Sequence, residues 1–319
     1  MNTPDIPADE PQRLATLRAL GVLDTAAEER FDRLTRMAKR LFRVPIALVS
    51  LVDENRQWFK SCVGLAASET GRDISFCGHA ILGDDIFYIP DALADERFAD
   101  NPLVTGAPHI RFYAGCPLHA ANGAKVGTLC VIDVQPREFD HDDAQALHDL
   151  ARMVEAELIA FQAATTDELT GISNRRGFRL LAQYSLNFCA RQNLPVSLAF
   201  LDLDKFKAIN DCFGHAAGDQ ALATFAELMR SSFRSADLLA RLGGDEFVVL
   251  LSEVEHERAH AAVAKFSRHL DAYNAGSGQP YQLAFSDGIV ELDAERHFSI
   301  EALLAEGDEL MYSIKAAKR

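Results

Sequence analysis

The sequence predicts an α/β (α+β) protein with two successive domains, each built on one sheet covered by helices. Three observations predict this class. Short apolar runs of strand length alternate with longer segments whose apolar residues recur every three or four positions. The 319 residues are enough for about two separate cores. A polar helical segment at 140–166 separates residues 13–139 from residues 167–319.

The N-terminal region predicts a mostly antiparallel sheet with helices to one side. Residues 1–12 are expected to be a loose tail. Two amphipathic helices should follow, with apolar faces formed by Leu14, Leu17, Leu20, Phe31, Leu34, Ala38 and Leu41. Strands are expected at 46–52, 57–63, 112–119 and 126–133. Asn122-Gly123 separates the last two runs and favours a hairpin turn.

The connecting helix, residues 140–166, carries a narrow apolar stripe. Its members are Leu147, Leu150, Val154, Leu158 and Phe161. Such a stripe suits a short parallel coiled coil with a second subunit, and it also suits a helix packed on its own sheet. Both interpretations stay open, because the N-terminal part of the helix can dock while the C-terminal part pairs.

The C-terminal region alternates helices and strands, which predicts one sheet covered by helices. Helices are expected at 176–192, 205–212, 219–233 and 255–275, and a final helix ends at 315–319. Strands are expected at 196–203, 238–240, 247–251 and 282–286, the last of which passes through Asp287-Gly288 into 289–292.

Composition excludes several classes of protein. No apolar run approaches the ~18 residues of a membrane span and the first thirty residues do not resemble a signal, so we expect a cytoplasmic protein without a membrane partner. A net charge of −15 argues against a nucleic-acid surface. The six cysteines lie mostly in apolar strands without a Cys-x-x-Cys pair, so we expect reduced core residues.

Two acidic segments carry the predicted chemistry. Gly243-Gly-Asp-Glu246 lies between two apolar runs and predicts a hairpin with its carboxylates at the tip. Asp202 and Asp204 end another strand on one face, with Leu203 on the opposite face. If the two strands are neighbours, Asp202 and Asp245 converge, and converging carboxylates repel unless a cation lies between them. Oxygen ligands of this kind suit Mg²⁺ together with phosphate oxygens.

Gly243-Gly-Asp-Glu-Phe247 matches the signature of the GGDEF diguanylate cyclases, and the resemblance covers about residues 167–319. Further matching blocks are Asp167-Glu-Leu-Thr-Gly-Ile-Ser-Asn-Arg-Arg176, Asp202-Leu-Asp-Lys-Phe-Lys-Ala-Ile-Asn-Asp211, Phe213-Gly-His-Ala-Ala-Gly-Asp219 and Asp308-Glu-Leu-Met-Tyr312. The resemblance implies condensation of two GTP molecules into cyclic di-GMP with release of two pyrophosphates. It also implies Mg²⁺, with Mn²⁺ as a second candidate.

The resemblance assigns roles to individual residues. The implied metal ligands are Asp202, the Leu203 carbonyl, Asp245 and Glu246. Asp245 is the implied proton acceptor, and Glu246 and Lys207 complete the catalytic set. The implied substrate-binding residues are Asn210, His215, Asp219, Lys315 and Arg319, of which Lys315 and Arg319 neutralise phosphate charge.

Asp219 has two interpretations. Its carboxylate can accept the N1–H and N2–H of guanine, which would select GTP over ATP. Alternatively, Asp219 is the N-cap of the helix that follows it. Arg234 and Asp237 also have two interpretations. They match the family's Arg-x-x-Asp inhibitory site for cyclic di-GMP, or they are an ordinary helix-end arginine and a turn aspartate.

The N-terminal region resembles a GAF domain over about residues 12–160. The matching blocks are Pro45-Ile-Ala-Leu-Val-Ser-Leu-Val-Asp53, Ser75-Phe-Cys-Gly-His-Ala-Ile81 and Gly127-Thr-Leu-Cys-Val-Ile-Asp133. This resemblance implies a sensor with a small-molecule pocket, whose ligand the sequence does not identify. Cys77 and His79 are expected to be core or pocket-wall residues, because no second pair of metal ligands accompanies them.

These observations predict a diguanylate cyclase that works as a homodimer under the control of its GAF domain and of product feedback. A degenerate GGDEF module that binds GTP or cyclic di-GMP without turnover is the alternative, and a scaffold for association is a third hypothesis. Degeneracy normally appears as lost acidic residues, and Asp202, Asp245 and Glu246 are all present. The sequence therefore favours the active enzyme.

Overall fold

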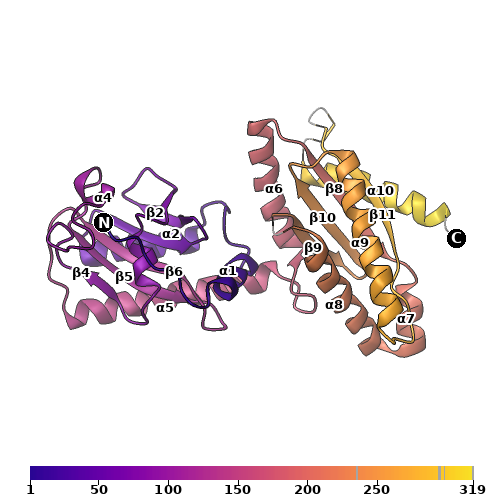
Figure 1. Ribbon diagram of the computed structural model, residues 1–319, viewed down its shortest axis with the longest axis horizontal. Coiled ribbons are helices and arrows are strands. Elements are labelled where there is room, and N and C mark those ends of the chain that lie inside the picture. The colour runs from indigo at the N-terminus through magenta and orange to yellow at the C-terminus, as the bar shows by residue number, and fades with distance from the viewer. Residues whose placement is uncertain (235, 294–295, 298, 318–319) are drawn as a thin grey trace. The chain divides into compact units, whose positions relative to one another are not determined.

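The structure is a computed structural model that describes residues 1–234, 236–293, 296–297 and 299–317. The chain divides into two compact units, Met1–Gln162 and Ala163–Arg319. Each unit consists of one sheet with helices packed on it (Figure 1). The predicted fold class, with an antiparallel sheet in the N-terminal region, is confirmed. No helix in the described part of the chain is both long and apolar enough to span a membrane.

The first unit contains a six-stranded antiparallel sheet with the order β3-β2-β1-β6-β5-β4. The strands are β1 (Ile46–Val52), β2 (Arg56–Val63), β3 (Glu69–Gly71), β4 (Phe87–Ile89), β5 (Phe112–His119) and β6 (Lys125–Asp133). The hairpin predicted at Asn122-Gly123 joins β5 to β6, and Gly123 adopts a φ of 84° that favours glycine. The central strand β1 is buried along its whole length because both faces of the sheet are covered.

Helices cover both faces of this sheet, whereas the sequence predicted helices on one side only. The helices are α1 (Glu10–Ala19), α2 (Glu29–Phe42), α3 (Phe76–Ala80), α4 (Pro102–Thr105) and α5 (His141–Thr165). Side chains of α2 and α5 share one core with one face, and α3 and α4 with their loops share a second core with the other. The sequence missed α3 and α4 because such short helices show little periodicity.

The N-terminal residues are packed on the first unit, so the expected loose tail is wrong. Pro4 is buried, and its ring occupies the space where a side chain at position 78 would lie, which only Gly78 leaves open. The Asn2 N–H donates to the Arg97 carbonyl at 3.0 Å. Glu10 already begins α1.

The apolar stripe of α5 belongs to the first unit's own core. All five stripe residues are buried together with residues of α2 and the sheet: Leu147, Leu150, Val154, Leu158 and Phe161. Of the two open interpretations, the structure therefore favours the docked helix for this stripe. The large apolar side chains that α5 exposes are Met153 and Ile159, which the stripe does not include.

The second unit contains a five-stranded sheet with the order β11-β8-β10-β9-β7. The strands are β7 (Ser173–Asn174), β8 (Val196–Leu203), β9 (Leu238–Gly243), β10 (Glu246–Ser252) and β11 (Phe285–Glu291). Strand β11 begins at Phe285 rather than at Gln282, and it continues through Asp287-Gly288. Gly288 is required there because a Cβ atom would lie 2.3 Å from the Gly307 carbonyl oxygen of the helix packed on it.

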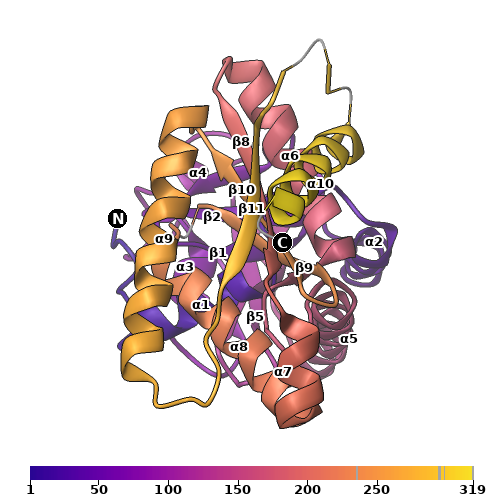
Figure 2. The same ribbon diagram turned by 90° about the vertical axis from the view of Figure 1, so that its right-hand side faces the viewer.

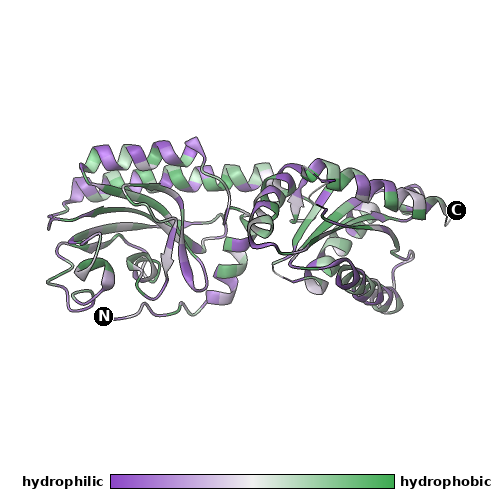
Figure 3. Cartoon of the chain, turned by 90° about the horizontal axis from the view of Figure 1, so that it is seen from above, coloured by the Kyte–Doolittle hydropathy of each residue, from purple (hydrophilic) through white to green (hydrophobic). Residues whose placement is uncertain are grey.

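The helices of this unit are α6 (Arg175–Gln192), α7 (Phe206–Phe213), α8 (His215–Ser232), α9 (His256–Gly276) and α10 (Ile300–Ala317). Helices α8 and α9 share a core with one face of the sheet, and α6 and α10 share a core with the other (Figure 2). The strands between these layers carry mostly hydrophobic colour in Figure 3, whereas the outer helices carry both hydrophilic and hydrophobic colour.

Candidate active site

The hairpin between β9 and β10 presents two carboxylates at its tip. Gly243 and Gly244 have φ values of 148° and 54°, which residues with a side chain rarely adopt. The Arg241 guanidinium donates from Nε to the Gly244 carbonyl at 2.9 Å and braces the turn. Asp245 and Glu246 follow directly, so the local sequence fixes where both side chains emerge.

The end of β8 lies beside this hairpin tip. Strand β8 is between β10 and β11, and Asp202 is in register with Glu246 on one side and Ser286 on the other. The Leu203 N–H donates to the Asp245 carbonyl at 3.1 Å. Backbone pairing thus brings the two acidic segments of the sequence together at one edge of the sheet.

Asp202 is a buried carboxylate held beside a cation. It is 8% exposed, and its pKa is raised by burial and by the charges of Asp245 and Asp204. Lys315 of α10 opposes this shift, because its ammonium donates to the Asp202 carboxylate. The Ser286 hydroxyl donates to Asp204 at 2.8 Å. The strand end therefore concentrates negative charge that favours a bound cation.

Glu246 is a half-buried acid at the same edge. Burial raises its pKa, and the neighbouring charges of Asp308, Asp202 and Asp245 raise it further against the opposing charge of Arg175. Arg175 lies 3.4 Å from Glu246, and it also donates from Nε to the Leu242 carbonyl at 3.0 Å.

Sequence reasoning did not assign a role to Arg175 or to Asp167, although both lie in a block that matches the family. The Asp167 carboxylate accepts bonds from the Thr170 N–H at 2.9 Å and from its hydroxyl at 2.7 Å, and it pairs with Arg241 at 3.1 Å. Burial opposes ionisation of Asp167, but these contacts outweigh it and lower its pKa. Asp167 therefore anchors the arginine that braces the hairpin turn.

The donor set at the sheet edge fits a hard divalent cation. The carboxylates of Asp202 and Asp245 and the carbonyl of Leu203 offer oxygen atoms, the kind of donor that suits Mg²⁺. Within the described ranges, no group of three or more His, Cys, Asp or Glu side chains is placed to hold a metal ion by itself. An ion here would need backbone, water or phosphate oxygens in its shell, as Mg²⁺ commonly has.

The expected guanine-binding residues lie where α7 meets α8. Helix α8 begins at His215 after Gly214, so Asp219 is an exposed residue inside the helix and the N-cap interpretation is wrong. The sequence misplaced this start because no side chain caps the helix. Asn210 of α7 packs against α8 at Gly218, where a Cβ atom would lie 2.0 Å from the Asn210 Oδ1. Asn210 therefore packs against the residue that directly precedes Asp219.

The expected phosphate-binding residues differ in their surroundings. Lys207 is exposed on α7, and it forms no ion pair with any described residue. Lys315 pairs with Asp202, as described above. Arg319 lies outside the described residues.

Arg234 and Asp237 are hydrogen-bonded to each other after α8. The half-buried Asp237 carboxylate accepts from the Arg234 N–H at 2.8 Å, and the Asp237 N–H donates to the Arg234 carbonyl at 3.0 Å. Burial raises the pKa of Asp237. The Arg234 side chain is exposed. The turn interpretation of Asp237 is thus correct, and it leaves the guanidinium available to a ligand.

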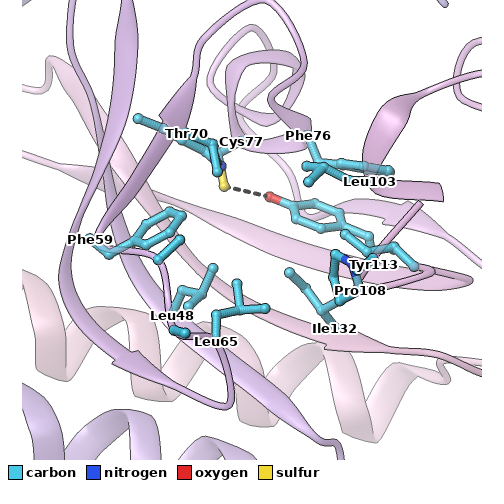
Figure 4. A pocket seen from close by; sticks show the side chains of 15 residues that line it. Leu48, Phe59, Leu65, Thr70, Phe76, Cys77, Leu103, Pro108, Tyr113 and Ile132 are labelled. Atoms are coloured by element: carbon cyan, nitrogen blue, oxygen red, sulfur yellow. Dashed lines mark hydrogen bonds between the residues drawn. The ribbon is translucent and has the colours of Figure 1, made fainter. Parts of the chain in front are cut away.

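The first unit contains a cavity of about 250 Å³ between its sheet and the loops around α3 and α4 (Figure 4). Its wall is mainly apolar, with polar groups from Gln57, Thr70, Cys77 and Tyr113. Cys77 is a wall residue, as predicted. His79 does not line the cavity, and one of its ring nitrogens lies 3.0 Å from the Asn2 carbonyl oxygen.

Comparison with known proteins assigns both units to families. Residues 164–319 match the family "Diguanylate cyclase, GGDEF domain", and residues 26–158 match the GAF domain family. The chain is 30% identical over 266 residues to the diguanylate cyclase DgcP of Escherichia coli, a match that covers 77% of this chain and 75% of that protein. The chain therefore belongs to the GGDEF family of diguanylate cyclases and carries an N-terminal GAF domain.

Two further similarities qualify this assignment. The chain is 34% identical over 295 residues to the cyclic di-GMP phosphodiesterase PA2567 of Pseudomonas aeruginosa, which covers 92% of this chain but only 50% of that protein. A solved structure of the coiled coil and GGDEF domain of DgcB from Caulobacter crescentus, in complex with c-di-GMP, is 22% identical with a TM-score of 0.51. The match covers 55% of this chain and 93% of the chain in that structure, and it shows the fold alone.

Proposed function

We propose that the protein is a diguanylate cyclase that condenses two GTP molecules into cyclic di-GMP and two pyrophosphates. One observation carries the proposal: β8 places Asp202 in register with Glu246, and the Leu203 N–H binds the Asp245 carbonyl. The three acids of the proposed metal site therefore lie at one sheet edge. In the reaction, the 3′-hydroxyl of one GTP attacks the α-phosphorus of the other as pyrophosphate leaves.

Each group of side chains has a defined task in this reaction. Asp245 accepts the proton of the attacking hydroxyl, and Lys207 and Lys315 neutralise phosphate charge. Asp219 and Asn210 hold the guanine edge, with His215 beside them. Mg²⁺ or Mn²⁺ held by Asp202, Asp245, Glu246 and the Leu203 carbonyl would polarise the phosphates and lower the pKa of the hydroxyl.

The working form in this proposal is a homodimer. Each catalytic unit binds one GTP, and the product contains two identical halves. A two-fold symmetric pair is the simplest assembly that brings two such half-sites face to face. The GAF domain and the Arg234–Asp237 turn are the proposed regulatory elements, the first through an unknown small molecule and the second through cyclic di-GMP.

The alternative is a nucleotide-binding module without turnover. It is favoured by the match to a protein named as a phosphodiesterase, half of which lies outside the match. Incubation of the purified protein with GTP and Mg²⁺, followed by mass identification of the products, separates the two functions. Cyclic di-GMP with pyrophosphate supports the cyclase, and GTP bound but unchanged supports the module. Parallel samples with ATP, and with cyclic di-GMP as substrate, test nucleotide preference and the reverse activity.

A further inference from the structure

Five polar side chains lie together in the apolar core beside the cavity of the first unit. Cys77 belongs to α3, and the others are strand residues: Ser50, Tyr113, Thr128 and Cys130. All five are at most 2% exposed. Their surroundings are apolar residues such as Leu48, Phe76 and Ile132. Polar groups in such a core require a reason, because their burial opposes folding unless they are hydrogen-bonded.

The sulfur of Cys77 lies between a second thiol and a phenol. Its distance to the Cys130 sulfur is 3.9 Å, and the Tyr113 hydroxyl donates to it at 3.3 Å (Figure 4). Gly115 makes this arrangement possible, because a Cβ atom there would lie 2.2 Å from the Tyr113 hydroxyl. The fold thus leaves space on the sheet for a tyrosine that reaches the thiol.

Two further hydroxyls near this sulfur lack partners. Ser50 and Thr128 face each other in register on β1 and β6, and neither side-chain oxygen has a hydrogen bond among the described residues. A buried donor without an acceptor costs about 1–3 kcal/mol. Both lie close enough to Cys77 to stabilise a negative charge on its sulfur. The core therefore holds donors that an anionic sulfur would satisfy.

The two thiols differ in their tendency to ionise. Burial opposes ionisation of Cys77, but the neighbouring donors Cys130, Thr128, Tyr113 and Ser50 would stabilise a thiolate there, and together they outweigh burial and lower the pKa of Cys77. The bond to Cys77, burial and charge on Cys77 raise the pKa of Cys130. One thiolate beside one protonated thiol is the arrangement that an attacking and a resolving cysteine require.

We propose that Cys77 and Cys130 form a redox pair, which a small hydroperoxide oxidises to a disulfide through the cavity. The Cys77 thiolate attacks one peroxide oxygen, the O–O bond breaks, and water or an alcohol leaves after taking up a proton. Cys77 is then a sulfenic acid. The Cys130 sulfur attacks the Cys77 sulfur, the S–O bond breaks, and water leaves as the disulfide forms. The two sulfurs lose two electrons, which the peroxide has gained.

Access and distance both permit this reaction. Cys77 lines the cavity, whose volume of about 250 Å³ far exceeds that of hydrogen peroxide. The sulfurs lie 3.9 Å apart and must approach by about 2 Å to reach the length of a disulfide bond. Cys116 of β5 and Cys189 of α6 are also buried free thiols, and neither contacts another thiol among the described residues. They are internal controls for buried cysteines without a partner.

The test is oxidation of the intact protein by limiting hydrogen peroxide, followed by alkylation and peptide mapping without reductant. We expect a peptide pair joined through Cys77 and Cys130 to appear at least about tenfold faster than any oxidation of Cys116 or Cys189. In Cys130→Ser, dimedone should trap a sulfenic acid on Cys77. Tyr113→Phe should slow oxidation of Cys77 by about tenfold through the lost donor. Tyr88→Phe removes a hydroxyl that donates to the Arg137 carbonyl, and it should leave the rate unchanged.

Two outcomes would overturn the proposal, and neither needs a variant. Oxidation of Cys77 no faster than that of Cys116 would show that the core does not activate it. A dimedone adduct that persists on Cys77 of the unsubstituted protein, without the joined peptides, would show that Cys130 does not resolve it.

Discussion

Lys315, near the end of α10, donates from its ammonium to the carboxylate of Asp202 at the end of β8. A residue expected to bind phosphate and a residue expected to bind metal are thus paired with each other. Both are largely buried, with side chains 21% and 11% exposed. Loss of the lysine would leave a buried carboxylate without its cation, and a divalent ion is the natural replacement.

Lys315→Ala should therefore lower the free energy of unfolding by about 1–3 kcal/mol, because Asp202 is left buried and unpaired. Added Mg²⁺ should recover part of this loss. Thermal unfolding with and without MgCl₂ measures both effects. Lys207→Ala removes an exposed lysine that has no ion pair within the described part of the chain, and it is the matched control. Unchanged stability of Lys315→Ala would mean that the ion pair contributes nothing.

Asp202→Asn and Asp245→Asn should each reduce cyclic di-GMP formation at least about a hundredfold while the protein stays folded. Each change removes a charge at the sheet edge but keeps the size of the side chain. Initial rates with GTP and Mg²⁺ and the circular dichroism spectrum are the measurements. Asp211→Asn makes the same change at an exposed position of α7 and should retain its activity. Turnover close to normal in either site variant would exclude the proposed metal site.

Local rules predicted the elements that form this site. The turn at Gly243-Gly244 follows from its need for positive φ, and the apolar run of strand length that begins at Val196 places Asp202 at the strand end. The pairs Lys315–Asp202 and Arg175–Glu246 could not be predicted, because contacts between distant segments leave no periodic pattern. The stripe of α5 has the same spacing in a coiled coil as in a docked helix, so only the packed structure distinguishes them.

Asp219→Ala should raise the KM for GTP by about tenfold or more and weaken the preference for GTP over ATP. Stability should change by less than about 0.5 kcal/mol, because Asp219 is exposed and does not cap α8. Steady-state kinetics with both nucleotides and urea unfolding test the two parts. Gln220→Ala alters the next exposed residue of the same helix and serves as the control. An unchanged nucleotide preference would remove Asp219 from the guanine site.

The first unit should lose stability in acid through Glu10. Glu10 is 8% exposed, and its carboxylate accepts two hydrogen bonds of 2.7 and 2.8 Å from Arg13, with Arg72 as a second partner. Burial opposes ionisation of Glu10, but the two arginines lower its pKa from 4.5 to about 2. Because the pKa of Glu10 is lower in the folded than in the unfolded protein, ionised Glu10 stabilises the fold at a pH above the unfolded pKa of 4.5. This stabilisation disappears as the pH falls from about 4.5 toward 2.

Glu10→Gln should therefore be less stable than the unsubstituted protein at neutral pH, and the difference should shrink by about 2 kcal/mol between about pH 6 and pH 3. Fluorescence of Trp58, the single tryptophan and part of this unit's core, reports unfolding of this unit in urea. Glu29→Gln removes an exposed acid that pairs with Arg36, and it should show little such change. A pH-independent difference for Glu10→Gln would argue against the linkage.

The last prediction concerns product feedback at Arg234. Its guanidinium is exposed, whereas its N–H is already bound by the Asp237 carboxylate at 2.8 Å. Arg234→Ala should therefore remove a ligand contact and keep the turn, while Asp237→Ala would also disturb the backbone. Arginine offers a planar pair of donors to phosphate or to the Hoogsteen edge of guanine, and a charge-assisted bond of this kind contributes about 1.5–3 kcal/mol.

We expect cyclic di-GMP to inhibit the unsubstituted enzyme without competing with GTP. Arg234→Ala should raise the inhibitory concentration by at least about tenfold and nearly preserve the initial rate. Initial rates over a range of product and GTP concentrations measure both quantities. Arg258→Ala, which removes an exposed arginine from α9, should keep the full sensitivity. Equal inhibition of Arg234→Ala and the unsubstituted enzyme would place feedback elsewhere, because the turn holds Asp237 in the same position in both proteins.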